Sequence, residues 1–208
     1  MEFLLSTFVV LFVVIDPIGL APIFLGLTRT QTADQQRSAA WRGTTLAALI
    51  LLVFFFSGDA LLRLLDISLP AFRIAGGILL FLLAIDMIFA RHSGLRSTTV
   101  REQAEAAHKP DVSVFPLAFP LIAGPGALTT VLLMANSWRT TFEFVGMLFL
   151  LLVVLGMALI SLLSAPFIMR LLGQTGANVI SRLLGLVLAA LAVQFVIDGI
   201  KTSFPGLS

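Results

Sequence analysis

Apolar residues are concentrated in six segments of the chain, each close to the roughly 20 residues that a helix needs to cross the hydrocarbon core of a bilayer. The segments lie at about 3–27, 44–62, 69–90, 112–136, 142–165 and 179–200. The longest polar stretch, 91–111, separates the third from the fourth, and we expect it to be mobile. The pattern predicts one integral membrane domain over residues 1–208, all α-helical, with six transmembrane helices.

The first and fourth segments are each interrupted in a way that an ordinary membrane-spanning helix avoids. In the first, Asp16-Pro17-Ile18-Gly19 sets a carboxylate and a proline within the apolar run, and in the fourth the interruption is Gly124-Pro125-Gly126. Proline removes a backbone donor and clashes with the preceding turn, and an ionised carboxylate at this depth costs at least a few kcal/mol. Such breaks persist in a membrane only where protein buries them or where they line a water-filled cavity.

The two breaks divide the chain into halves that match over a longer distance. Pro17 and Pro125 are 108 positions apart, and an arginine follows each proline at nearly the same spacing, Arg73 after 56 residues and Arg182 after 57. We therefore expect a repeat. Its copies span about 1–90 and about 112–208. Because each copy has three spans, the second enters the membrane upside down, which makes an inverted-topology repeat with broken first and fourth helices.

Composition agrees with this class of protein and excludes others. Of the 208 residues, 59% are hydrophobic and 12% are charged, and the mean hydropathy is +1.07, so the chain has too little polar surface for a soluble domain. The net charge of +2 is too small to indicate a nucleic-acid partner. With no cysteine, disulfides and Cys-ligated metals are excluded.

The distribution of basic residues predicts an orientation, because cytoplasmic loops carry an excess of Lys and Arg. Nine of the 13 Lys and Arg fall on the side of the connections between spans one and two, three and four, and five and six. The other four fall on the opposite side. Both termini are therefore expected to face away from the cytoplasm.

Each break has the residues of a helix start. Asp is a good N-cap and proline favours the first helical position, so Asp16 and Pro17 predict a half-helix that runs to about Leu27. Gly124 and Pro125 would begin the equivalent half-helix, but glycine has no side-chain cap, so the free amides and the positive dipole end could hold an anion. The candidate substrate-binding residues are Asp16, Pro17, Gly19, Gly124, Pro125, Gly126, Thr129 and Thr130.

We hypothesise that the two breaks recognise a zwitterion, with its ammonium near Asp16 and its carboxylate near Gly124 and Gly126. In the alternative interpretation, Asp16 only caps its helix and the glycines only permit close packing. Thr129 and Thr130 could line the same cavity, although hydroxyls bonded back to their own helix are the commoner arrangement.

Arg73 and Arg182 are candidate charge partners. Each lies near the start of a span, where its side chain can simply reach water at the interface. A cation in the first turn is, however, opposed by the helix dipole, so a carboxylate such as Asp16, Asp59 or Asp66 would help to explain Arg73.

Several motifs together resemble a known family. They are DPIG at 16–19 followed by APIF at 21–24, RIAGGILLFLLAIDM at 73–87, PLAFPLIAGPGALTT at 116–130 and AVQF at 192–195. With them, nearly the whole chain resembles the MarC family of bacterial inner-membrane proteins. That family is distantly similar to the LysE-type amino-acid exporters, and some relatives are described as small neutral amino-acid transporters. The resemblance implies six spans in the bacterial inner (plasma) membrane and amino-acid transport.

We therefore expect a transporter or exporter of small solutes, with a small-molecule substrate and the lipid bilayer as its partners, and not an enzyme. An intramembrane acid such as Asp16 could titrate or ligate an ion, which leaves proton or sodium coupling open. Two other classes remain, a membrane scaffold without transport and an intramembrane aspartyl hydrolase that uses Asp16 and Asp59 as paired acids. No cofactor or metal site is expected, since His92 and His108 have no recognisable third ligand.

Overall fold

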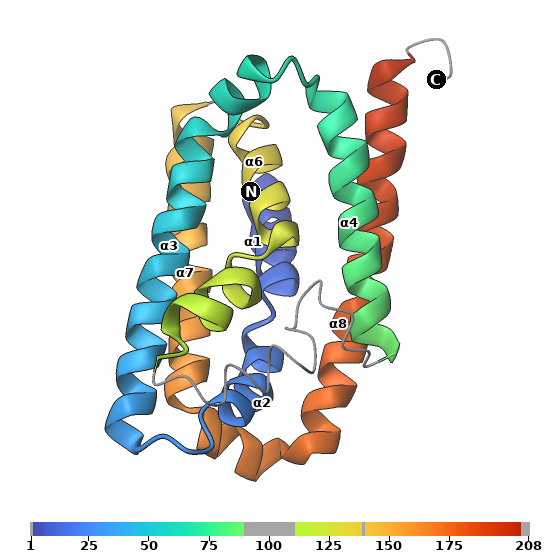
Figure 1. Ribbon diagram of the computed structural model, residues 1–208. Coiled ribbons are helices and arrows are strands. Elements are labelled where there is room, and N and C mark those ends of the chain that lie inside the picture. Colours follow the sequence, from blue (N-terminus) through green and yellow to red (C-terminus); the bar gives the residue numbers. More distant parts are fainter. Residues whose placement is uncertain (1, 90–110, 139, 205–208) are drawn as a thin grey trace.

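The computed structural model describes residues 2–89, 111–138 and 140–204, which form a helical bundle in which α1 begins and α8 ends toward the same end (Figure 1). The elements are α1 (Glu2–Ile15), α2 (Pro17–Leu27), α3 (Ala33–Leu64), α4 (Leu69–Phe89), η1 (Ser113–Ile122), α6 (Pro125–Ala135), α7 (Thr141–Leu163) and α8 (Ala165–Ser203). Among the described residues, five spans are long and apolar enough to cross a membrane, and the bent pair of η1 and α6 makes a sixth. The predicted all-α class with six spans is confirmed.

Both breaks occur where the sequence predicts them. Asp16 separates α1 from α2, and α2 has the predicted bounds. η1 and α6 meet at Gly124 with a bend of 57°. η1 itself is irregular, because Phe115 (φ −130°) and Phe119 (φ −132°) are extended. Each precedes a proline, whose ring disfavours a helical conformation in the residue before it.

Two spans are longer than predicted. α3 begins at Ala33 rather than near 44, because Thr32 and Gln35 form a reciprocal capping box at its start. α8 begins at Ala165 rather than near 179 and turns at Gly173, whose φ of 63° suits glycine. The expected connections 28–43 and 166–178 are therefore largely helical. The predicted polar loop lies outside the described residues except for its last member, Asp111.

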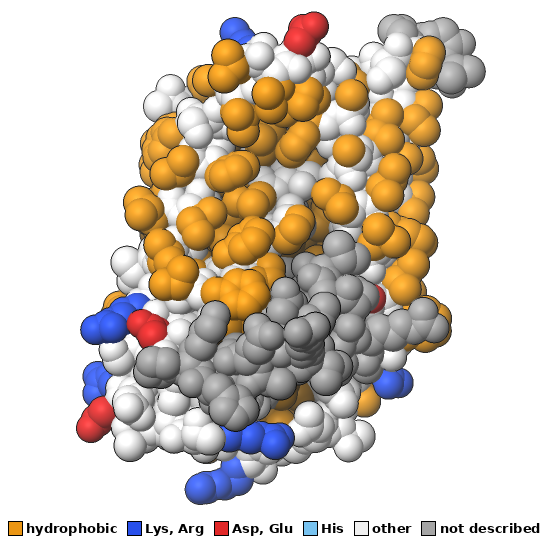
Figure 2. Space-filling model, in the orientation of Figure 1, with side chains coloured by type: hydrophobic (Ala, Val, Ile, Leu, Met, Phe, Trp, Pro, Cys, Tyr) orange, Lys and Arg blue, Asp and Glu red, His pale blue; other side chains and the backbone are white. Residues whose placement is uncertain are grey.

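The first span is the most deeply buried of the five spans. Within its most apolar stretch, 61% of the residues are buried in the protein, against 22–39% for the other four spans. The other spans turn apolar side chains outward, and these side chains are spread over the upper part of the face seen in Figure 2. The broken helix and its carboxylate are thus surrounded by protein rather than lipid, which is the condition for such a break to persist.

The two halves of the chain interlock. The main contacts of α4 are with α8 and α6, those of α3 are with η1, α6 and α7, and α1 and α2 pack on α7 and α8. α4 and α8 approach closely in a reciprocal manner, because a Cβ added at Gly77 would lie 2.8 Å from the carbonyl oxygen of Ala192, and one added at Gly185 would lie 3.2 Å from that of Ala84. The two contacts are equivalent under the predicted repeat, because Gly185 lies 108 positions after Gly77 and Ala84 lies 108 positions before Ala192. The inverted repeat stays a prediction, and this reciprocity supports it.

Candidate functional site

Asp16 forms the predicted cap at the first break. Its side chain is fully buried, and its backbone is left-handed (φ 46°, ψ 68°), a conformation that Asp tolerates better than most residues. The amide of Gly19 donates to Asp16 Oδ1 at 3.0 Å. The chain's own carboxylate therefore holds the positive end of α2.

Two serines from the second half hold this break in position. Ser181 Oγ on α8 donates to Asp16 Oδ2 at 3.3 Å, and Ser161 Oγ on α7 donates to the carbonyl oxygen of Pro17. Gly19 leaves room for this arrangement, because a Cβ there would lie 2.8 Å from Ser181 Oγ and would overlap the Asp16 carboxylate. Sequence reasoning missed both serines, since a single serine in an apolar helix usually bonds back to its own helix.

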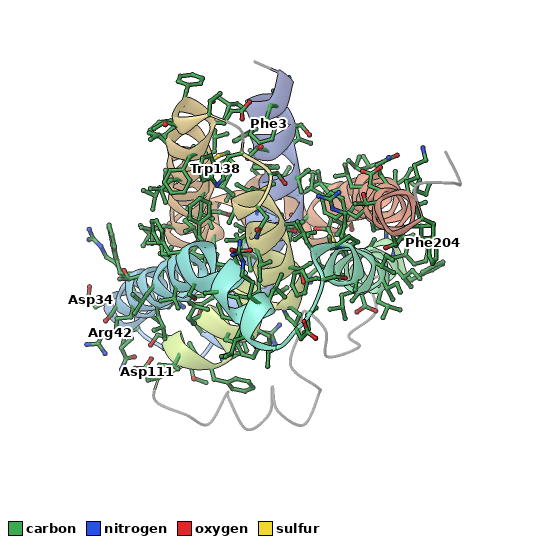
Figure 3. The ribbon with its side chains drawn as sticks, turned by 90° about the horizontal axis from the view of Figure 1, so that it is seen from above. Phe3, Asp34, Arg42, Asp111, Trp138 and Phe204 are labelled. Carbon is green, nitrogen blue, oxygen red and sulfur yellow. The ribbon has the colours of Figure 1, made fainter. Side chains whose placement is uncertain are left out.

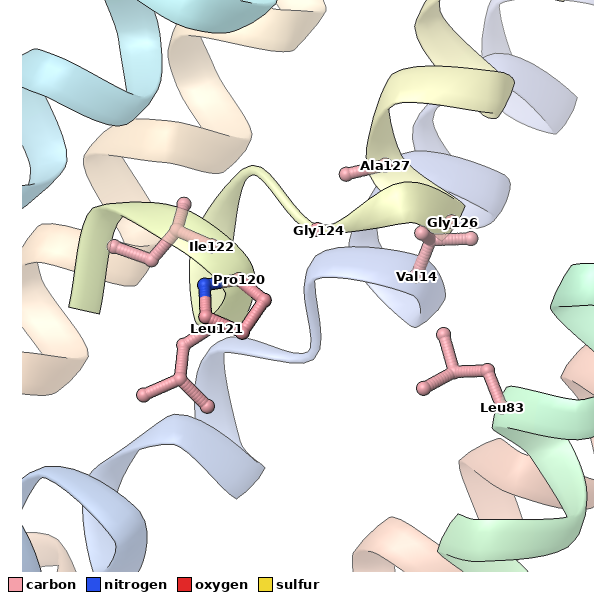
Figure 4. Close-up of a pocket in the computed structure, with 8 residues that line it drawn as sticks. All are labelled: Val14, Leu83, Pro120, Leu121, Ile122, Gly124, Gly126 and Ala127. Carbon is pink, nitrogen blue, oxygen red and sulfur yellow. The ribbon is translucent and has the colours of Figure 1, made fainter. Parts of the chain in front are cut away.

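The second break has a helix start without a side-chain cap. Gly124 is the extended N-cap residue of α6 (φ −72°, ψ 173°), and no side chain of the described residues is seen to bond to the first amides. This start faces a small pocket between the breaks (Figure 4). The pocket is lined by Val14, Leu83, Pro120, Leu121, Ile122, Gly124, Gly126 and Ala127. Its volume is about 10 Å³, close to the minimum for one water molecule, so this pocket is too small to hold an amino acid as it stands.

The two threonines of α6 are buried, but neither lines this pocket. A Cβ added at Gly76 of α4 would lie 3.3 Å from the Cβ of Thr129 and would overlap its methyl group. Thr130 is completely buried, and its Oγ1 has no hydrogen-bond partner among the described residues. The expected bond back to its own helix is therefore absent at Thr130, which leaves an unsatisfied hydroxyl in the core.

The structure brings Asp16 together with Ser181, and not with either of the two candidate arginines, Arg73 and Arg182. Within the described ranges, neither Arg73 nor Arg182 makes an ion pair with a carboxylate. Arg73 is partly exposed on α4, and Arg182 is exposed on α8. Asp59 pairs instead with Arg63 at 2.9 Å, and about half of its side chain is exposed.

A second polar contact ties the start of η1 to α3 outside the breaks. Arg42 Nη1 lies 3.6 Å from Asp111 Oδ2, and the two side chains are neighbours at one edge of the bundle (Figure 3). The hydroxyl and the amide of Ser113 donate to Asp111 Oδ1. These hydrogen bonds, with a smaller contribution from Arg42 and against the effect of burial, hold the pKa of Asp111 below its usual value.

Comparison with known proteins assigns the chain to a family. The family model described as MarC family integral membrane protein matches residues 1–204. Membrane protein YhcE of Escherichia coli (strain K12) is 37% identical over 204 residues, which cover 96% of this chain and 93% of that protein. Membrane protein YvbG of Bacillus subtilis (strain 168) is 36% identical over 207 residues, which cover 100% of this chain and 98% of that protein. No solved structure matches the chain significantly. The chain therefore belongs to the MarC family of integral membrane proteins.

Proposed function

We propose that the protein transports a small solute that carries a carboxylate, most simply a small neutral amino acid, across the membrane. The observation that carries the proposal is the difference between two equivalent helix starts. Asp16 and Gly124 are 108 positions apart, and each is the N-cap residue of a half-helix. At α2 a carboxylate of the chain binds the first turn, whereas at α6 no side chain of the described ranges does so. A solute carboxylate would bind α6 as the Asp16 carboxylate binds α2.

The ammonium group of the same solute is assigned to the neighbourhood of Asp16. Val14, two residues before Asp16, lines the pocket at the second break, and its Cγ1 would lie 3.6 Å from a Cβ added at Gly126. The buried carboxylate and the uncapped amides of α6 therefore belong to adjacent parts of one region. Opposite charges at the two ends of this region suit a zwitterion. Proton or sodium coupling through Asp16 is part of the proposal.

The proposed location is the bacterial inner membrane, with both termini on the non-cytoplasmic side. Basic side chains gather at the end of the bundle where α2 leads into α3 and α7 leads into α8 (lower end of Figure 2). Arg29, Arg37 and Arg170 are exposed there. This end corresponds to the cytoplasm by the positive-inside rule, and α1 begins and α8 ends toward the other end.

Transport is favoured over the aspartyl hydrolase by the surroundings of the two acids. Paired catalytic acids must approach closely enough to share a proton. Asp16 is fully buried and bonded to Ser181, whereas Asp59 is half exposed and paired with Arg63. We therefore propose that the protein is not an enzyme.

The test is flux of labelled glycine and alanine in liposomes that contain the purified protein, with proton and sodium gradients varied separately. We expect gradient-dependent flux in the wild type and its loss in Asp16→Asn, which keeps the cap but removes the charge. Alaninamide, which lacks the carboxylate, should neither compete nor be transported. Undiminished flux in Asp16→Asn would eliminate the ammonium role, and equal transport of alaninamide would eliminate the carboxylate role.

A matched pair of glycine variants tests the pocket. Gly126→Ala adds a methyl group to the pocket wall, 3.0 Å from the Leu80 Cδ2 atom, which is the flexible end of a side chain. Gly26→Ala in α2 is the control, because nothing lies within 4 Å of its added Cβ. We expect Gly126→Ala to lower flux and Gly26→Ala to leave it unchanged. If glycine and alanine at saturating concentration neither move nor raise the melting temperature of the protein, the scaffold function replaces transport.

A further inference from the structure

The pair α4 and α8 obeys the 108-residue symmetry closely. Gly77 faces Ala192 and Val196, and Gly185 faces their counterparts Ala84 and Ile88. Both glycines pack against backbone carbonyl oxygens and side chains of the facing helix, so the two helices approach closely. The contact between α4 and α8 is therefore symmetric, and the positions of the half-helices α2 and α6 can be compared relative to it.

The half-helices α2 and α6 do not obey the same symmetry. On α2, a Cβ added at Gly19 would lie 2.8 Å from Ser181 Oγ of α8. A shift by 108 positions converts this pair into Ala127 of α6 and Arg73 of α4. In the structure, however, the first turn of α6 faces a later part of α4, since a Cβ at Gly126 would lie 3.0 Å from Leu80 Cδ2.

The displacement can be estimated from the contact between Gly76 and Thr129. α4 and α6 run in opposite directions (Figure 1), so Arg73, three residues before Gly76, lies at the level of about residue 132 of α6. Symmetry would put it beside Ala127 instead. At 1.5 Å of rise per residue, the two half-helices differ by roughly 8 Å in their position along the symmetric pair.

We propose that this difference is the conformational change of the transporter, with α2 and α6 exchanging their positions against the pair α4 and α8. The inference rests on the proposed transport function. In the exchanged state, Thr129 leaves Gly76, and their counterparts Ala21 and Leu184 come together. Asp16 leaves Ser181, and Ala127 arrives beside Arg73. The exchange changes the side of the membrane from which the region between the breaks can be reached, as an inverted repeat permits.

The chain has no cysteine, so pairs of introduced cysteines report on each state without background. Gly76→Cys/Thr129→Cys tests the observed state, since its Cβ atoms would lie 3.3 Å apart, close to the 3.5–4.5 Å of a disulfide. Ala21→Cys/Leu184→Cys tests the exchanged state, and so does Arg73→Cys/Ala127→Cys. Neither pair should reach disulfide distance without the exchange. Gly77→Cys/Val196→Cys within the symmetric pair is the control that should form in both states.

The experiment oxidises each variant in liposomes with copper phenanthroline, identifies linked peptides by mass spectrometry and measures flux before and after reduction. We expect all four pairs to form disulfides. The disulfides of the observed-state pair and of Ala21→Cys/Leu184→Cys should each stop flux reversibly, and the control disulfide should not. Arg73→Cys/Ala127→Cys removes an arginine and is therefore read by disulfide formation alone. The proposal is overturned if both exchanged-state pairs stay reduced while the observed-state pair forms, or if flux persists through a locked protein.

The readouts separate the two proposals. If the exchanged-state disulfides form but the unlocked protein moves neither glycine nor alanine, the exchange stands and amino-acid transport falls. If the protein transports them but both exchanged-state pairs stay reduced, transport stands and the exchange falls. Single-cysteine variants show whether each substitution alone permits folding and flux. Because two independent pairs report on the exchanged state, one misfolded variant does not remove the test.

Discussion

Replacing Gly19 with alanine tests whether the cap at the first break is built as described. A Cβ at this position would overlap the Asp16 carboxylate and lie 2.8 Å from Ser181 Oγ. The carboxylate would have to move, which would break its hydrogen bonds with the Gly19 amide and with Ser181. The substitution should therefore destabilise the protein, although alanine is normally the better helix former.

The expected size follows from three contributions. Loss of a side-chain cap costs about 1 kcal/mol, and loss of a hydrogen bond to a charged group costs about 1.5 kcal/mol at the low end, which suits the long Ser181 contact. Replacing glycine by alanine within a helix returns roughly 0.5–1 kcal/mol. The net loss in the free energy of unfolding is then about 2 kcal/mol.

The assay is unfolding by sodium dodecyl sulfate in mixed micelles, followed by circular dichroism. Gly26→Ala in the same helix is the matched control and should be neutral or slightly stabilising, since its Cβ meets nothing within 4 Å. In an Asp16→Ala background the cost of Gly19→Ala should largely disappear, because the two positions share one contact. Equal stability of Gly19→Ala and Gly26→Ala would refute the described geometry.

Three further substitutions test other parts of the molecule. Gly185→Ala brings a Cβ to 2.8 Å from the Cβ of Met87 and should lower the free energy of unfolding by about 1–3 kcal/mol in the same assay. Gly156→Ala is the control and should not lower it, because a Cβ at Gly156 meets nothing within 4 Å. Asp111→Asn should lower the free energy of unfolding at neutral pH. The pKa of Asp111 is lower in the folded protein, so its ionised carboxylate stabilises the fold above the ordinary carboxyl pKa, and this stabilisation fades as the pH falls. The difference in stability between the variant and the wild type should therefore disappear in acid. Thr130→Val keeps the shape of the side chain but removes an unpartnered buried hydroxyl, and should stabilise the protein by about 1 kcal/mol in thermal unfolding; a loss would mean that the hydroxyl is bonded.

Local signals in the sequence predicted the breaks well. The Asp-Pro start at 16–17 marked the bounds of α2, and Gly124 was correctly expected to lack a cap. Boundaries set from apolar segments alone were less accurate, because the first turns of α3 and the part of α8 around Gly173 are more polar than the hydrocarbon core requires. The capping box at Thr32 and Gln35 was a readable signal for α3 that the apolar pattern concealed.

The partners of the site could not be predicted in the same way. Ser181 is 165 positions from Asp16, and Ser161 is 144 positions from Pro17. Which serine of an apolar helix turns toward the break depends on how the two halves interlock, and no local spacing encodes that packing. The small volume of the pocket is likewise a property of one arrangement of helices.

Arg73 acquires a specific role from the proposed exchange. It is the counterpart of Ser181, just as Gly124 is the counterpart of Asp16. At the first break, the acid Asp16 is bonded to the neutral hydroxyl of Ser181. At the second break, the corresponding positions hold the cation Arg73 and Gly124, which has no side chain. The carboxylate missing there is the one that the solute would supply. Arg73→Gln should therefore weaken amino-acid transport.

The size of this effect follows from the interaction that would be lost. A charge-assisted hydrogen bond contributes about 1.5–3 kcal/mol, and each 1.4 kcal/mol corresponds to a factor of about ten in affinity. The half-saturating concentration of alanine in the flux assay should rise by roughly 10- to 100-fold in Arg73→Gln. Arg182→Gln is the matched control, because its arginine is exposed on α8 and is not the counterpart of Ser181. An equal loss in both variants would indicate a general effect of interfacial charge, and no loss in Arg73→Gln would remove this arginine from the transport cycle.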